Sequence, residues 1–169
     1  MSFTPATAKA LAGLGLDPTV IERLVQVALT EDLGSGVDVT SLATVPFDLE
    51  GVADFTARAS GVVAGLPVVR AVMEVVTDDS VVITQHVQDG DAVSAGDVLL
   101  TARALVRALL TAERTALNIL CHLSGIAKGF TQSAVSPTNN CAVAVARTPC
   151  CVRPTICPKN IGSGLPPGR

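Results

Sequence analysis

One stripe of polar side chains in the sequence could bind a small anion. Helical periodicity runs from about Ala104 to Gly129, and at roughly 100° per residue it groups several polar residues on one stripe, namely Arg107, Thr111, Arg114, Asn118 and His122. A solvated helix face normally mixes acidic with basic residues, but this stripe holds no acid. Arginine pairs with carboxylate or phosphate oxygens two at a time. The stripe therefore indicates an anionic ligand or a partner subunit, and a solvated helix face is the alternative.

Other groups that could do chemistry have weaker patterns. The C-x8-C-C-x5-C spacing lacks the paired hooks of structural zinc sites, and its cysteines are Cys141, Cys150, Cys151 and Cys157. No nucleophile pattern accompanies His86 or His122, so we predict neither a metal site nor a catalytic residue in this chain. Acid and base roles could be shared by Glu31, Asp32 and Asp38, although these residue types favour a loop cap or a solvated turn.

The surrounding sequence predicts helices and strands in alternation. Asp17 can cap a helix that has Pro18 in its first turn and continues to about Thr30, after a flexible N-terminus of residues 1–16. The polar, glycine-rich stretch from Glu31 to Ser41 predicts a loop. Further elements follow from β-branched runs, turn residues and apolar spacing, namely strands at 51–59, 81–87 and 98–102, a helix at 66–76, and the long helix at 104–129. The long helix has a predicted apolar face, whose residues recur at spacings of three and four, namely Leu105, Leu109, Ala112, Ala116, Ile119, Leu120, Leu123 and Ile126.

Composition excludes several classes of protein. The chain has 169 residues, of which 49% are hydrophobic and 16% charged, so disorder over the whole length is not expected. Aromatic residues make up only 2% and the net charge is −3, which argues against nucleic-acid binding. No apolar run reaches the 18 or so residues of a membrane span, and the first residues do not resemble a signal peptide. We therefore expect a cytoplasmic protein without membrane or nucleic-acid partners.

Four ordered motifs carry a resemblance to a known family. RALLTAERTALNILCHLSGIAKG (Arg107–Gly129) resembles the signature helix of quinolinate phosphoribosyltransferases, also called nicotinate-nucleotide pyrophosphorylases. LTEDLGSGVDVTS (Leu29–Ser41) is similar to that family's opening loop, and GVVAG (Gly61–Gly65) and the segment Val87–Leu99 follow in the family's order. The resemblance covers roughly Asp17 to Gly129. Lys128 departs from it, because the family usually has a small hydroxylated residue there.

The resemblance implies a reaction and a binding residue. Such enzymes act in NAD biosynthesis, joining quinolinate to phosphoribosyl pyrophosphate with Mg²⁺ and releasing pyrophosphate and CO₂ to give nicotinate mononucleotide. The matching arginine of the E-R-T motif reaches across a homodimer towards the quinolinate carboxylates in the neighbouring subunit. Arg114 is therefore the substrate-binding residue that we transfer, as a buried arginine in contact with a carboxylate. An ion pair with Glu113 or with a dimer partner is the alternative.

The resemblance also implies a fold class, of which the chain holds one part. The family's N-terminal domain is α+β, with an antiparallel sheet covered by helices, and we expect this domain at residues 17–129. The β/α barrel domain that follows in the family needs about 200 residues or more, so it cannot fit into residues 130–169. The Mg²⁺ ligands are also absent, because no acidic residue follows Glu113 and Mg²⁺ prefers oxygen ligands. We therefore expect this chain alone to be inactive.

The charge distribution separates the last part of the chain from the rest. Residues 1–113 carry all fifteen acidic residues and six basic ones, whereas residues 114–169 carry six basic residues and no acid. Residues 130–169 are also rich in Cys and Pro, and Cys141–Ala146 could be a remnant of the first barrel strand. We hypothesise that this divergent tail is out-of-frame translation; a naturally evolved tail is the alternative. If the tail is out-of-frame translation, barrel-like sequence should be found in the other two reading frames past codon 129.

A cofactor carrier and a dimerisation fragment are two alternatives to the enzyme. Residues 87–102 also resemble the half-repeat of lipoyl and biotinyl carrier domains, which hold their cofactor on a lysine at a hairpin tip. No lysine lies between Lys9 and Lys128, so the chemistry of a carrier is missing. The chain could alternatively be a noncatalytic dimerisation fragment of the enzyme, with an exposed apolar helix face that is prone to association.

Overall fold

The computed structural model describes residues 3–34, 39–78, 80–135 and 152–158 of the chain. It is an α+β fold with an antiparallel four-stranded sheet in the order β3-β5-β1-β6. The strands are β1 (Glu50–Ala57), β3 (Val82–Gln85), β5 (Val98–Leu105) and β6 (Val152–Pro158). A two-stranded ribbon pairs β2 (Gly61–Val62) with β4 (Ala92–Val93). The predicted fold class is confirmed.

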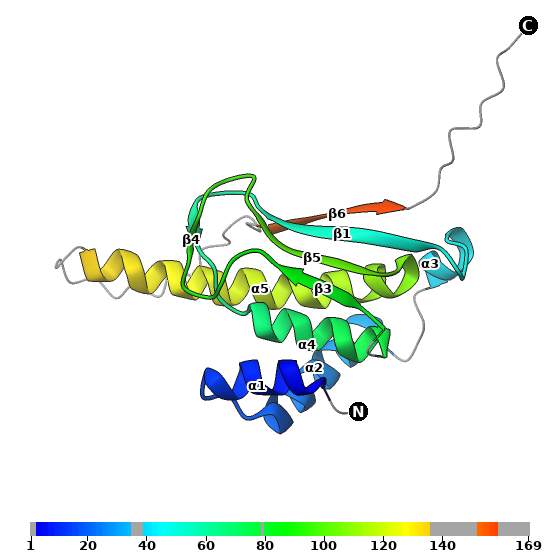
Figure 1. The fold of residues 1–169 in the computed structure, drawn as a ribbon, viewed down its shortest axis with the longest axis horizontal. Helices are drawn as coiled ribbons and strands as arrows, with labels where there is room; N and C mark the ends of the chain where they lie inside the picture. Colours follow the sequence, from blue (N-terminus) through cyan, green and yellow to red (C-terminus); the bar gives the residue numbers. More distant parts are fainter. Residues whose placement is uncertain (1–2, 35–38, 79, 136–151, 159–169) are drawn as a thin grey trace, which may run out of the picture.

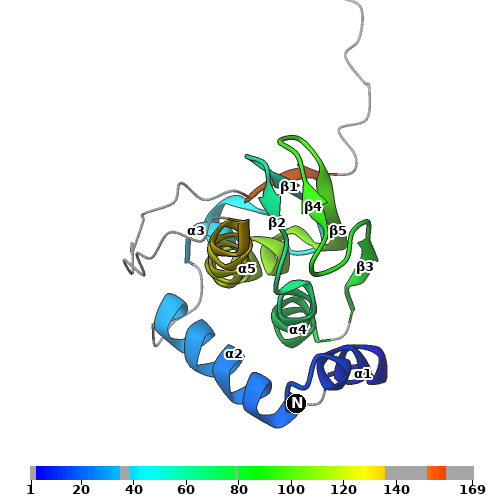
Figure 2. The ribbon, with the colours of Figure 1, turned by 90° about the vertical axis from the view of Figure 1, so that its left-hand side faces the viewer.

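Helices form two layers on one side of the sheet (Figures 1 and 2). The long helix α5 (Val106–Val135) and α4 (Leu66–Thr77) lie against the sheet, and α1 (Pro5–Gly13) and α2 (Pro18–Leu33) lie beyond them. The short helix α3 (Val39–Thr44) lies beside the start of α5. The opposite face of the sheet carries no helix among the described residues.

Alternating side chains of the central strand build the core. Residues of β1 alternate between buried and half-buried positions, and its buried side faces the helices with Ala53, Phe55 and Ala57. The predicted apolar face of α5 packs there with Leu109, Ala112, Ala116 and Leu120, all at most 1% exposed. Burial of such apolar surface is the main force that holds the helices on the sheet.

The predicted start of α2 is confirmed. Asp17 is its N-cap, and its carboxylate accepts hydrogen bonds from the Thr19 backbone N–H at 2.8 Å and from the Thr19 hydroxyl at 2.7 Å. These hydrogen bonds to the charged form lower the pKa of Asp17 below its ordinary value. The helix runs past Thr30 to Leu33, however, so the first residues of the predicted loop are helical.

The N-terminal segment differs from the expected flexible residues 1–16. Pro5–Gly13 forms α1, which is capped by Thr4 and buries Thr7 and Leu11 completely. The buried carboxylate of Glu74 on α4 accepts hydrogen bonds from the Thr4 backbone N–H and from the hydroxyls of Thr4 and Thr7. This long-range anchor holds α1 on the fold, and it has no local signature in the sequence.

The domain boundary predicted at residue 129 falls inside a helix. Helix α5 continues through it to Val135, and β6, from the region predicted as a divergent tail, pairs antiparallel with β1. Pro154 and Pro158 lie in β6, which is tolerated because β6 is an edge strand of the sheet. The stretch Cys141–Ala146 lies outside the described residues.

Gly65 is the N-cap of α4 and lies close to α5. Its φ of +105° lies in the left-handed region, and a Cβ there would be 2.6 Å from Leu123 Cδ1. Any other residue at this position would have a strained backbone, and its Cβ would clash with Leu123. The glycine therefore allows α4 and α5 to approach closely.

Candidate functional site

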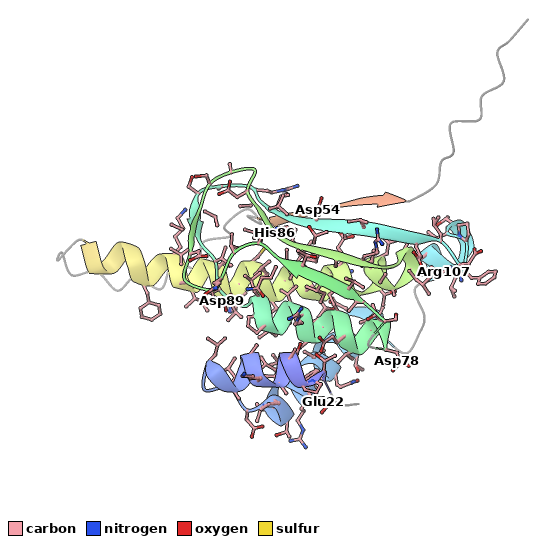
Figure 3. The ribbon with its side chains drawn as sticks, viewed as in Figure 1. Glu22, Asp54, Asp78, His86, Asp89 and Arg107 are labelled. Atoms are coloured by element: carbon pink, nitrogen blue, oxygen red, sulfur yellow. The ribbon has the colours of Figure 1, made fainter. Side chains whose placement is uncertain are left out.

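The first arginine of the predicted stripe has a structural role. Arg107, in the first turn of α5, donates hydrogen bonds from Nε to the Val45 carbonyl at 2.7 Å and from Nη2 to the Leu42 carbonyl at 3.0 Å. These carbonyls lie in and just after α3, so Arg107 fastens this segment to α5 (Figure 3). Two of its donors are used within the fold, and the prediction that Arg107 belongs to an anion site is not supported.

The other residues of the stripe are of two kinds: one bonds within α5 and three are exposed. The Thr111 hydroxyl donates to the Arg107 carbonyl at 2.9 Å, one turn back along α5, as threonine often does inside helices. Arg114, Asn118 and His122 are exposed. Three residues of the predicted stripe thus reach solvent from one face of α5, and Arg114 is the one with a permanent charge.

Arg114 forms an ion pair with a residue of α2. Its Nε lies 3.5 Å from Asp32 Oδ1, and the side chains of Arg114 and Asp32 are 77% and 18% exposed. Arg114 is therefore exposed, where a buried arginine was expected. Among the described residues, the ion-pair partner of Arg114 is Asp32, and not Glu113 as in the alternative to substrate binding.

The other oxygen of Asp32 is held by a buried hydroxyl. Thr115 is 1% exposed, and its Oγ1 donates to Asp32 Oδ2 at 2.5 Å. Asp32 belongs to the EDLG motif and Thr115 to the ERT motif, so the two motifs meet at one carboxylate. In the sequence, Asp32 is a candidate only for an acid, base or cap. No local pattern indicates this contact, because it joins residues 83 positions apart.

Glu113 lies half-buried on α5 beside Arg114 in the sequence. Its burial raises the pKa of the carboxyl above its ordinary value, because a low-dielectric environment penalises the charged form. The ionised carboxylate is therefore less stable here than in water.

A separate polar chain lies on the sheet face away from α4 and α5 (Figure 3). The hydroxyl of Thr101 on β5 donates to Asp54 Oδ1 on β1 at 2.7 Å, and His86 Nε2 lies 2.9 Å from the same hydroxyl. A hydroxyl has one proton to donate, so Thr101 must accept from His86 Nε2–H. These three side chains link β1, β5 and the residue that follows β3, but they bring no nucleophile together with a base.

The described residues offer no metal centre and no membrane span. No group of three or more His, Cys, Asp or Glu side chains lies close enough together in them to hold a metal ion. Cys121 is half-buried, and the side chains of the four cysteines predicted not to bind zinc lie outside what the structure describes. In the same residues, no helix is both long and apolar enough to cross a bilayer.

The exposed guanidinium of Arg114, whose Nε lies beside Asp32, can bind an anion by charge and hydrogen bonding. The fold and this helix define a class of protein. Residues 38–124 match the model of the quinolinate phosphoribosyl transferase N-terminal domain. The chain belongs to this family.

Relatives and solved structures agree with this assignment. The chain is 46% identical over 101 residues to the nicotinate-nucleotide pyrophosphorylase [carboxylating] of Mycobacterium leprae, an alignment of 59% of this chain and 36% of that protein. It is 36% identical over 107 residues to quinolinate phosphoribosyltransferase [decarboxylating] 1b of Nicotiana tabacum, covering 63% of this chain and 30% of that protein. The chain thus spans about a third of the relatives that it matches.

Two solved structures share the fold. NadC from Streptococcus pyogenes superposes with a TM-score of 0.66 at 34% identity, over 72% of this chain and 44% of that one. The nicotinate-nucleotide pyrophosphorylase from Francisella tularensis superposes with a TM-score of 0.64 at 29% identity, over 69% and 40% of the two chains.

Proposed function

We propose that this chain supplies the N-terminal domain of an enzyme that makes nicotinate mononucleotide for NAD biosynthesis. The quinolinate nitrogen forms a bond to C1 of phosphoribosyl pyrophosphate as the C1–O bond breaks and pyrophosphate leaves. The ring carboxylate next to that nitrogen then leaves as CO₂, and the ring carbon that carried it takes up a proton from solvent. One observation supports this proposal. Arg114 lies exposed on α5, the helix that resembles the family's signature, and forms an ion pair with Asp32 of α2.

Arg114 binds the substrate in this proposal. Quinolinate carries two carboxylates, and a guanidinium can donate two parallel hydrogen bonds to one of them. The 77% exposure of the Arg114 side chain suits a residue that reaches into the site of a neighbouring subunit in a homodimer. Arg114 thereby orients quinolinate by hydrogen bonding to its carboxylates.

The described residues do not fit a Mg²⁺ site, because they hold no cluster of carboxylates that could ligate it. No step is therefore assigned to Mg²⁺ on this chain, and the chain alone is expected to be inactive. A cytoplasmic location also stays a prediction, since relatives in plants carry mitochondrial and chloroplastic names.

A second candidate is a noncatalytic association domain. It is favoured by large apolar side chains on the outer surface of α2, where Val20, Leu24 and Val27 are 61%, 51% and 62% exposed. These residues recur at helical spacing and would be covered in an assembly. Activity supplied in trans distinguishes this candidate from the first.

The test is turnover of quinolinate and phosphoribosyl pyrophosphate, with nicotinate mononucleotide as the product measured. The 169-residue chain alone should give no product. A Mycobacterium leprae relative whose E-R-T arginine is changed to alanine should be weakly active, and the added chain should restore its activity by supplying Arg114. The same chain carrying Arg114→Ala is the matched control. Equal restoration by both chains, or by neither, would contradict the proposed role of Arg114.

A further inference from the structure

We propose that Asp32 is a positioning residue, which holds the Arg114 guanidinium so that its outer edge faces a substrate carboxylate. The inference rests on the proposed function, because it assigns Arg114 to quinolinate. In it, Asp32 of α2 orients the side chain of Arg114 of α5 before a ligand binds.

The two oxygens of Asp32 have different partners. Oδ2 accepts from the hydroxyl of the buried Thr115, and Oδ1 lies 3.5 Å from Arg114 Nε. Exposure rises along this series, from 1% for Thr115 to 18% for the Asp32 side chain and 77% for Arg114. A buried hydroxyl thus fixes the carboxylate, and the fixed carboxylate restrains an arginine that otherwise lies in solvent.

The position of the contact on the guanidinium decides what Arg114 can still bind. A guanidinium has five N–H donors in a planar fork, and Asp32 lies against Nε at its inner end. The edge formed by Nη1 and Nη2 is the one that matches two carboxylate oxygens. Asp32 therefore restrains the side chain without occupying that edge.

Restraint has a thermodynamic benefit for binding. Immobilising a long, flexible side chain on binding costs conformational entropy, and Arg114 is long and exposed. A side chain that is already oriented loses less freedom when it binds. The negative charge of Asp32 has the opposite effect, because it lowers the local positive potential that attracts an anion. The two effects therefore predict opposite results when the charge of Asp32 is removed. When the restraint is removed and the charge is kept, only the loss of restraint changes binding.

Three variants separate the effects. Thr115→Val removes the hydroxyl that fixes Asp32 but keeps the charge of Asp32. Asp32→Asn keeps an oxygen that can accept from Thr115 but removes the ion pair with Arg114. Glu31→Gln is the matched control, since it removes one negative charge from an adjacent, exposed position of α2.

The kinetic readout is activity restored to the arginine-less Mycobacterium leprae relative by each chain at saturating concentration. Thr115→Val and Asp32→Asn should each raise the KM for quinolinate by up to roughly tenfold, because the side chain of Arg114 must then be ordered on binding, with the KM for phosphoribosyl pyrophosphate unchanged. Glu31→Gln should change neither. A lower quinolinate KM in Asp32→Asn, with no change in Thr115→Val, would show that Asp32 opposes binding and would overturn the proposal.

A second readout needs only the 169-residue chain. The Arg114 Nε–H signal in a ¹H–¹⁵N NMR spectrum, assigned by its loss in Arg114→Lys, should move in Thr115→Val and Asp32→Asn and stay in place in Glu31→Gln. An unmoved signal in both variants would overturn the positioning role. If the wild-type chain restores no activity, the proposed function fails, and this spectrum alone decides whether Asp32 restrains Arg114.

Discussion

Asp89 caps helix α4 from a turn more than twenty residues away. Its Oδ2 accepts from the Gly65 backbone N–H at 2.8 Å, and its Oδ1 accepts from the Leu66 backbone N–H at 2.9 Å. Gly65 is the N-cap position of α4 and has no side chain to fill that role. The carboxylate also lies at the positive end of the helix dipole. One residue therefore ties the turn after β3 to the start of α4 (Figure 3).

Asp89→Ala should destabilise the domain. The substitution leaves two partly buried N–H groups without their acceptor, so the expected loss in the free energy of unfolding is about 1–3 kcal/mol, measured by urea denaturation. Asp97→Ala is the control, because Asp97 accepts one hydrogen bond from Ser94 N–H in an exposed turn. A loss no larger in Asp89→Ala than in Asp97→Ala would contradict the capping role.

Glu74→Ala should release α1 from the rest of the fold. The buried carboxylate accepts three hydrogen bonds from Thr4 and Thr7, and its removal leaves their donors unsatisfied. We expect a loss of roughly 2–4 kcal/mol and faster amide hydrogen exchange in α1. Glu74→Gln keeps one oxygen acceptor, so it should lose less. Unchanged exchange in α1 after Glu74→Ala would rule out this anchor.

Glu113 should make stability depend on pH. Burial raises the pKa of its carboxyl in the folded state, so the folded state binds this proton more tightly than the unfolded state does. The free energy of unfolding should therefore fall as the pH rises from the unfolded pKa through the folded pKa. Glu113→Gln should remove this component and be more stable than the wild type at neutral pH. Thermal melts of both proteins from pH 4 to pH 8 are the measurement, and parallel profiles would contradict the expectation.

Local patterns in the sequence predicted most of the fold. Asp17 caps α2 through a residue two positions away, and the spacing of Leu109, Ala112 and Leu120 identified the buried face of α5. The periodicity failed towards the end of that face, where Ile126 is 46% exposed. Contacts between neighbours in sequence are visible without a fold, and these elements depend on such contacts.

The features that the sequence did not reveal depend on distant partners. Arg107 matched the stripe in spacing, but carbonyls more than sixty positions away use its donors. The same reason explains why α1, held by Glu74, and the contact of Asp32 with Thr115 could not be predicted. Composition predicted a break near residue 129, yet the backbone of α5 continues across it. Of the predicted stripe, the exposure of Arg114, Asn118 and His122 agrees with a surface that can meet a ligand or partner.

The most direct test of Arg114 as the substrate-binding residue is a calorimetric titration of quinolinate into the mixed complex. This complex contains the 169-residue chain and the arginine-less Mycobacterium leprae relative. Arg114→Ala should weaken quinolinate binding by about 3 kcal/mol or more, through two missing hydrogen bonds to charged oxygens. Arg107→Ala, whose arginine bonds only to carbonyls among the described residues, should leave that affinity unchanged. Unchanged affinity in Arg114→Ala, or an equal loss in both variants, would contradict the account.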